Sequence, residues 1–294
     1  MLRPLPLLTA LVLAGPVLFG LIGTILPAFG YLVPGADRPM TMALTWPGLP
    51  RALTVSVTSG ILSTLGALSV AALITAGWHG TRVFVWLERM LSPLLAVPHA
   101  AAALGLAFLV SPSGWILRIP ANVMGWEAAP DLLILNDPWG LSLTAGLIAK
   151  EMPFLLLMML AALTQVSAGP RLAVARSLGQ GRVSAWMKAV FPDVYAQMRL
   201  PVLVVLVFGM TNVDVAVILG PTTPTTLSVQ VTRWMMDPDL SARAVAAAGG
   251  LILFAATLVV LAVWLVAERL MAQIGRAWVW SGRGAPERLA RGGG

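Results

Sequence analysis

The chain lacks cysteine and has only two histidines and few charged residues. Without cysteine, disulfides, zinc–thiolate sites, iron–sulfur clusters and thiol nucleophiles are excluded, and His79 and His99 are too few for a histidine-built metal site. Charged residues are 11% of the 294 residues, against about 25% in soluble domains. Hydrophobic residues reach 58%, and the mean hydropathy is +0.87. This composition favours a membrane protein over a water-soluble domain.

Six long apolar runs are each able to cross a bilayer, for which a helix needs about 20 mostly apolar residues. Strands of a membrane β-barrel would show short alternating segments instead. The sequence therefore predicts an all-α integral membrane fold with six transmembrane helices. The predicted spans are residues 5–33, 53–76, 90–110 (or from 83), 139–166, 198–219 and 244–267, and the longest outer loop, 111–138, is expected to pack across the outer mouth.

The first run has an alternative interpretation as a cleaved signal peptide, because Arg3 precedes it and Val12-Leu13-Ala14 resembles a cleavage site. Its apolar stretch continues to Val33, which favours a span.

Basic residues predict the orientation, because arginine and lysine are enriched in cytoplasmic loops. With both termini inside, 13 of the 19 basic residues fall on the cytoplasmic side. This topology, with attraction to anionic lipid, accounts for the net charge of +7 without nucleic acid. Residues 1–270 are then one six-helix transmembrane domain, and residues 271–294 form a cytoplasmic tail that is interfacial or disordered.

The segment 167–193 is polar enough to leave the membrane, yet it is patterned for two short helices. Pro170 suits the first turn of a helix, and Gly179 and Gly181 mark a break that can adopt positive φ. A second apolar face follows, and Pro192 ends the second helix. A plain connector between two spans would not need this helix–turn–helix, so we expect a partner to dock there.

This loop resembles that of the membrane subunits of binding-protein-dependent ABC importers. Their loop carries Glu-Ala-Ala, three residues, Gly, nine residues, then Ile-x-Leu-Pro. With the family glycine at Gly179, the alanine at Ala175 and the proline at Pro192 match, whereas Ala173 replaces the glutamate. The resemblance implies that this loop couples to the ATPase through Ala173, Ala175, Arg176, Ser177, Leu178, Gly179 and Pro192.

The segment from Asn212 to Leu227 is similar to one branch of uptake permeases, near the thiamine, iron and sulfate permeases. The resemblance implies a type I importer permease fold in the bacterial cytoplasmic membrane. It also implies three kinds of partner: ABC ATPase subunits, a second permease half of the same or a related chain, and an external substrate-binding protein that delivers a small solute.

The chain has no Gly-x-x-x-x-Gly-Lys-Ser/Thr phosphate-binding loop. We therefore expect that it binds no cofactor, catalyses no reaction, and relies on a partner subunit to hydrolyse ATP.

Three ionisable residues fall inside predicted spans: Lys150, Glu151 and Asp214. A charge at the centre of a membrane helix costs about 2.5–3.5 kcal/mol on insertion scales, so these side chains should face the bundle interior or pair. We predict that Lys150 pairs with Asp214 between helices while Glu151 makes another contact, with Asn212 adding a polar group beside Asp214. The group either fixes helix packing or lines the translocation path.

The alternative function is a secondary transporter driven by an ion gradient, with Lys150, Glu151 and Asp214 as coupling groups. Such carriers commonly contain inverted repeats, and no convincing repeat relates the two halves of this sequence. A membrane assembly factor would explain the spans but not the cytoplasmic loop.

Overall fold

A computed structural model of the chain describes residues 5–33, 35, 37–125 and 134–280. Within these ranges all regular structure is α-helical, which confirms the predicted fold class. The helices are α1 (Leu5–Ala28), α2 (Pro39–Thr45), α3 (Leu49–Trp78), α4 (Arg82–Ala96), α5 (His99–Val110), α6 (Trp115–Met124), α7 (Leu141–Leu163), α8 (Ala168–Ser177), α9 (Arg182–Ala189), α10 (Phe191–Thr211), α11 (Asp214–Leu219), α12 (Leu227–Met235) and α13 (Ser241–Trp280).

Six helical segments are long and apolar enough to cross a membrane. Four of them correspond to predicted spans, with ends that shift by a few residues or, for α13, extend further, and the third and fifth differ more. The segments are Leu8–Ala28, Leu49–Trp78, His99–Ala121, Leu141–Leu163, Phe191–Thr211 and Ser241–Arg276. The cytoplasmic location of both termini stays a prediction.

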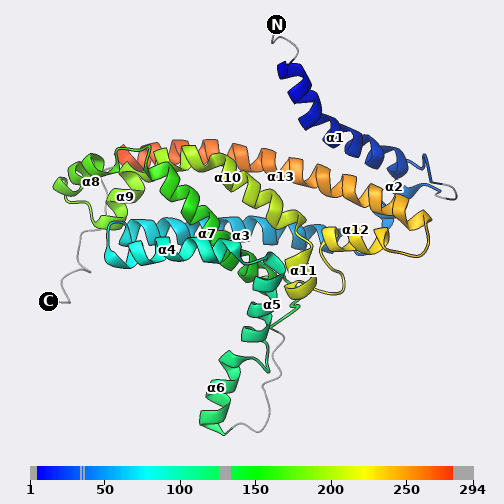
Figure 1. Cartoon of the computed structure of the whole chain (residues 1–294), viewed down its shortest axis with the longest axis horizontal. Helices are drawn as coiled ribbons and strands as arrows, with labels where there is room; N and C mark the ends of the chain where they lie inside the picture. Colours follow the sequence, from blue (N-terminus) through cyan, green and yellow to red (C-terminus); the bar gives the residue numbers. More distant parts are fainter. Residues whose placement is uncertain (1–4, 34, 36, 126–133, 281–294) are drawn as a thin grey trace.

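Helices α3, α7 and α10 form the centre of the bundle. Figure 1 shows α3, α4, α10 and α13 running along the long axis, with α8 and α9 at one end and α2 and α12 at the other. The buried face of α3 carries small residues at helical spacing: Ala52, Ser56, Gly60, Ser63, Ala67 and Ala71. Small residues at such an interface let helix backbones approach closely.

The closest approach lies between α3 and α10, at Gly60 and Gly209. A Cβ added at Gly209 would lie 3.0 Å from the Cα of Gly60, and one added at Gly60 would lie 2.4 Å from the Cγ of Met210. Hydrogen in place of a side chain is therefore what allows these two helices to cross here.

The third predicted span, 90–110, is wrong as a single helix. The chain breaks at Val97-Pro98 between α4 and α5, because Pro98 has no amide hydrogen to donate to the carbonyl of Leu94. The candidate span starts at the break and includes most of α6. In Figure 1, α5 and α6 project away from the long axis, so the part of segment 111–138 that forms α6 does not pack across the end of the bundle.

The fifth predicted span, 198–219, is also interrupted. Helix α10 ends at Thr211 and the short α11 begins at Asp214. The Asn212 side chain stabilises this break. Its Oδ1 accepts a hydrogen bond of 2.8 Å from the Val215 amide, as the side chain of a helix-capping residue does.

Helix α13 is longer than its predicted span and continues through Trp280. The boundary predicted at residue 270 therefore falls inside a helix, and residues 281–294 of the predicted tail lie outside the described residues. Near the end of α13, the Glu268 carboxylate accepts hydrogen bonds from the Tyr195 hydroxyl and the Trp264 indole and pairs with Arg199 at 2.7 Å. These contacts join α13 to α10.

Candidate functional site

The predicted helix–turn–helix in segment 167–193 is present as α8 and α9. Gly179 follows α8 with φ +79°, the left-handed conformation that glycine adopts without strain. The Gln180 amide donates to the Ala175 carbonyl at 3.2 Å, and the Gly179 amide donates to the Arg176 carbonyl at 2.9 Å. These two bonds are the Schellman arrangement that ends a helix, so Gly179 sets the turn between the two short helices.

None of the residues of α8 is buried, and several of its side chains face outward. Val174 and Leu178 are 62% and 75% exposed, and Ala173, Arg176 and Ser177 are exposed as well. Since Val174 and Leu178 are four residues apart, they lie on the same side of the helix. The structure therefore leaves an apolar pair in the open at one end of the molecule.

Helix α9 is held against the bundle, in contrast to α8. The Arg182 guanidinium donates to the carbonyl oxygens of Ala76 (3.3 Å) and His79 (2.7 Å), where α3 ends. Trp186 is 2% exposed and packs in the central apolar cluster with Phe191. Pro192 does not end α9, which stops at Ala189, but occupies the first turn of α10, where a missing amide hydrogen costs nothing.

Lys150 is buried in α7, and its partner is not the predicted one. Its ammonium donates to the carbonyl oxygens of Leu94 (3.3 Å), Leu95 (3.4 Å) and Val97 (2.5 Å). These carbonyls end α4, and the break at Pro98 deprives them of amide donors. A cation at the carbonyl end of a helix also complements the helix dipole.

Glu151, the next residue, reaches the other side of the same break. Its Oε1 lies 3.1 Å from Nε2 of His99, the first residue of α5. The His99 ring also packs against Phe208 of α10, with 4.8 Å between ring centroids. Lys150 and Glu151 therefore hold the two ends that meet at Val97-Pro98.

The predicted Lys150–Asp214 pair is wrong. Asp214 is exposed in the first turn of α11, and it forms no ion pair with Lys150 in the described structure. The physical reason is the break at Asn212, which takes Asp214 out of the helix that was expected to carry it past α7. Ion coupling through Lys150, Glu151 and Asp214 would need these residues in one cluster, and they do not form one.

Four side chains here were not singled out as site residues from the sequence: His79, His99, Arg182 and Trp186. The approach of His99 to Glu151 depends on the chain turning after Pro98, and the contact of Arg182 with the end of α3 joins residues about a hundred positions apart. Pro98 was the local signal for the contact between His99 and Glu151. The contact of Arg182 with the end of α3 had no signal in the sequence.

A comparison with curated proteins supplies the decisive similarity. The chain is 31% identical over 211 residues to the inner membrane ABC transporter permease protein YnjC of Escherichia coli strain K12. The chain is a relative of ABC transporter permeases. The match covers 70% of this chain and 39% of the relative, so the chain spans about two-fifths of the length of the protein it matches. No protein-family model matches it.

The six apolar helices agree with this similarity to an inner membrane protein. Together they indicate that the chain is a multi-pass membrane protein.

Proposed function

We propose that the chain is the membrane-spanning permease subunit of an ATP-binding cassette importer in the bacterial inner membrane. It would form the translocation pathway for a small solute with a second permease half. A separate ATPase would supply the energy, and an external binding protein would deliver the solute. The similarity to a protein named as an ABC transporter permease supports this proposal.

The observation that carries the coupling role is the contrast between α8 and α9. Helix α9 is packed on the bundle through Trp186 and Arg182, so it moves with α3 and α10. Helix α8 leaves Val174 and Leu178 exposed beside it. A partner that binds α8 would therefore be connected through α9 to two of the central helices, which is what conversion of ATPase motion into helix motion requires.

The Arg171–Asp193 ion pair adds a second connection between α8 and the start of α10. Both side chains are about half exposed, so the pair contributes little free energy, but it limits the directions in which α8 can turn.

The exposed apolar surface of the spans supports the proposal that lipid and a second permease half surround the helices. None of the apolar window of α1 is buried, and 11% of that of α13 is buried. A single chain therefore leaves much of its span surface for lipid and for a second permease half.

The test is co-purification of an ATPase with the full chain in mild detergent. The double variant Val174→Asp/Leu178→Asp places two carboxylates on the exposed face of α8, and we expect it to lose the ATPase. Met236→Asp is the control. Met236 directly follows α12 at the other end of the molecule, and its side chain is 78% exposed.

Size-exclusion profiles and melting temperatures would show that both variants fold. Recovery of the ATPase by the α8 variant, or its absence from the wild-type chain, would contradict the proposal and favour the gradient-driven carrier.

A further inference from the structure

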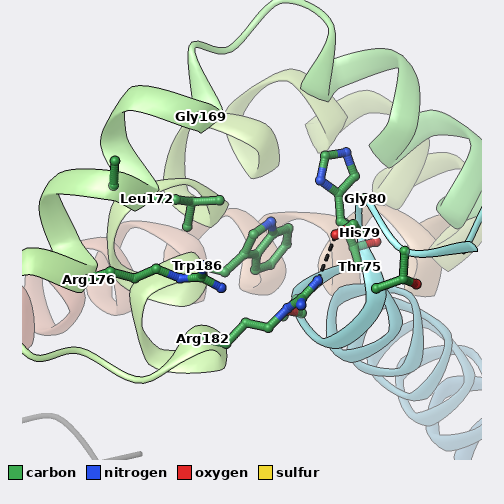
Figure 2. Close-up of a pocket in the computed structure, with 11 residues that line it drawn as sticks. Thr75, His79, Gly80, Gly169, Leu172, Arg176, Arg182 and Trp186 are labelled. Atoms are coloured by element: carbon green, nitrogen blue, oxygen red, sulfur yellow. Dashed lines mark hydrogen bonds between the residues drawn. The ribbon is translucent and has the colours of Figure 1, made fainter.

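A cavity of about 360 Å³ lies where α3 ends and the helices α8 and α9 pack beside it (Figure 2). Three parts of the chain that are distant in sequence build it: the end of α3 with the turn that follows, α8, and α9. The residues that matter for its chemistry are His79, Thr81, Leu172, Arg176, Arg182 and Trp186.

Trp186 contributes a donor that the protein leaves unsatisfied. Its side chain is 2% exposed, and its Nε1 has no hydrogen-bond partner in the described structure. In Figure 2 this nitrogen lies on the edge of the indole between Leu172 and His79, which both line the cavity. Because a buried N–H without an acceptor is costly, an acceptor supplied by a ligand would be favourable here.

The charge of the lining has one sign. Arg176 and Arg182 both line the cavity, and no acidic residue does. Arg182 uses Nε and Nη2 on the last carbonyls of α3, which offsets the negative end of that helix, and still has other N–H groups. The guanidinium of Arg176 has no hydrogen bond to a described residue. The cavity therefore has a positively charged lining, and the buried indole N–H beside it lacks an acceptor.

The start of α4 adds to this preference. Thr81 caps α4, and its hydroxyl accepts from the Phe84 amide at 3.3 Å. The positive end of a 15-residue helix therefore lies at the cavity wall.

We propose that this cavity binds a phosphate group, carried either by a free phosphate monoester or by the headgroup of an anionic phospholipid. Arginines from α8 and α9 line the space beside the positive end of α4, which suits an anion with several acceptor oxygens. Leu172 and Ala173 give the remaining wall an apolar character suited to the organic part. The cavity also lies at the end of a membrane-spanning helix, the depth at which basic pockets meet lipid headgroups.

A phosphate held there would contact Arg176 of α8 and Arg182 of α9, and Arg182 also binds the last carbonyls of α3. It would therefore fix α8, whose own residues are not buried, to the transmembrane bundle. Binding itself depends on the chain alone and does not rest on the proposed function.

The test uses the purified full chain and two probes. In the first arm, glycerol 3-phosphate is titrated into the detergent-solubilised chain by calorimetry. In the second arm, the chain is reconstituted with phosphatidylcholine and phosphatidic acid, and native mass spectrometry records the lipid that stays bound. Arg176→Gln removes one charge, and Trp186→Phe removes the indole N–H while keeping an aromatic ring. Arg89→Gln is the matched control, because it removes the same charge from an exposed position on α4 that does not line the cavity.

We expect each cavity variant to weaken binding about tenfold and the control to leave it unchanged. Binding of glycerol 3-phosphate would identify a soluble ligand, and retention of phosphatidic acid alone would identify a lipid. Failure of the wild-type chain to bind either probe would overturn the proposal and leave the cavity to a side chain of a partner protein. Equal losses in Arg89→Gln and Arg176→Gln would overturn it too, since they would reveal only general charge attraction.

Discussion

The Lys150 ammonium lies 2.5 Å from the carbonyl oxygen of Val97, at the end of α4. In a continuous helix the Leu94 carbonyl would accept from residue 98, but that residue is proline and has no amide hydrogen. The lysine therefore supplies the donors that the break removes. Lys150 is thus a buried cation in a membrane-spanning helix, and its partners are backbone carbonyl oxygens and not a carboxylate.

Replacement of Lys150 by methionine should lower the stability of the folded chain by about 2 kcal/mol, because carbonyls at the end of α4 lose a charged donor. Lys150→Arg keeps donors and should cost less. The measurement is the unfolding transition of the purified full chain in detergent. The double reversal Lys150→Asp/Asp214→Lys should be at least as unstable as Lys150→Met, and recovery of wild-type stability in that variant would restore the Lys150–Asp214 pair.

The contact between Glu151 and His99 predicts energetic coupling across α5 and α7. Single variants Glu151→Leu and His99→Phe each remove one partner, and the double variant removes both. Because the two side chains touch at 3.1 Å, we expect the effects on unfolding to be non-additive by about 1 kcal/mol. Glu151→Gln retains an acceptor and should be milder than Glu151→Leu. Simple additivity in the cycle would show that the two groups do not interact.

The sequence predicted the helical class, the span positions of four helices and the loop with two short helices, because long apolar runs and the Gly179 break are local signals. It failed at the two interruptions. Hydrophobicity continues across Pro98 and across Asn212, so the pattern alone shows one span where the backbone forms two helices. The proline was visible in the sequence, but the cap that Asn212 provides for α11 depends on a single side-chain hydrogen bond.

The site was predictable to a similar extent. Gly179 could be identified because a left-handed turn needs glycine, and its φ of +79° agrees with that reason. The partner of Lys150 could not, because it is a set of backbone carbonyls that the fold creates. Nor could the cavity next to Trp186, whose walls come from residues about a hundred positions apart in the chain.

The crossing of α3 and α10 should not tolerate a larger residue at Gly60. A valine there would bring Cβ to 2.4 Å from the Cγ of Met210 and 3.0 Å from its backbone nitrogen, so one helix must move. Overpacking of this kind costs about 1–3 kcal/mol, measured as a lower melting temperature of the full chain. Gly250→Val is the control, because no atom lies within 4 Å of a Cβ there. Equal melting temperatures for the two variants would contradict the close approach.

The Asp137 carboxylate, which precedes α7, should make stability depend on pH at the acidic end. Burial acts to raise its pKa, but hydrogen bonds from the amides of Ser142, Leu141 and Trp139 and from the Ser142 hydroxyl outweigh it and hold the pKa below the ordinary value. The unfolded chain therefore takes up a proton at a higher pH than the folded chain does. The stabilising contribution is complete above about pH 4 and is lost as the pH falls through the lowered pKa of the folded state.

Asp137→Asn should cost about 1 kcal/mol at neutral pH, as the loss of a helix cap does. Its melting temperature should approach that of the wild-type chain as the pH falls from about 4 through the lowered pKa of the folded state, where the wild-type carboxylate becomes protonated too. The measurement is the melting temperature of both proteins between pH 7 and pH 3. The control is Asp37→Asn, since the exposed Asp37 carboxylate makes no hydrogen bond to a described residue, and its curve should run parallel to that of the wild type. A constant difference between Asp137→Asn and the wild type across this range would show that the carboxylate charge does not stabilise the start of α7.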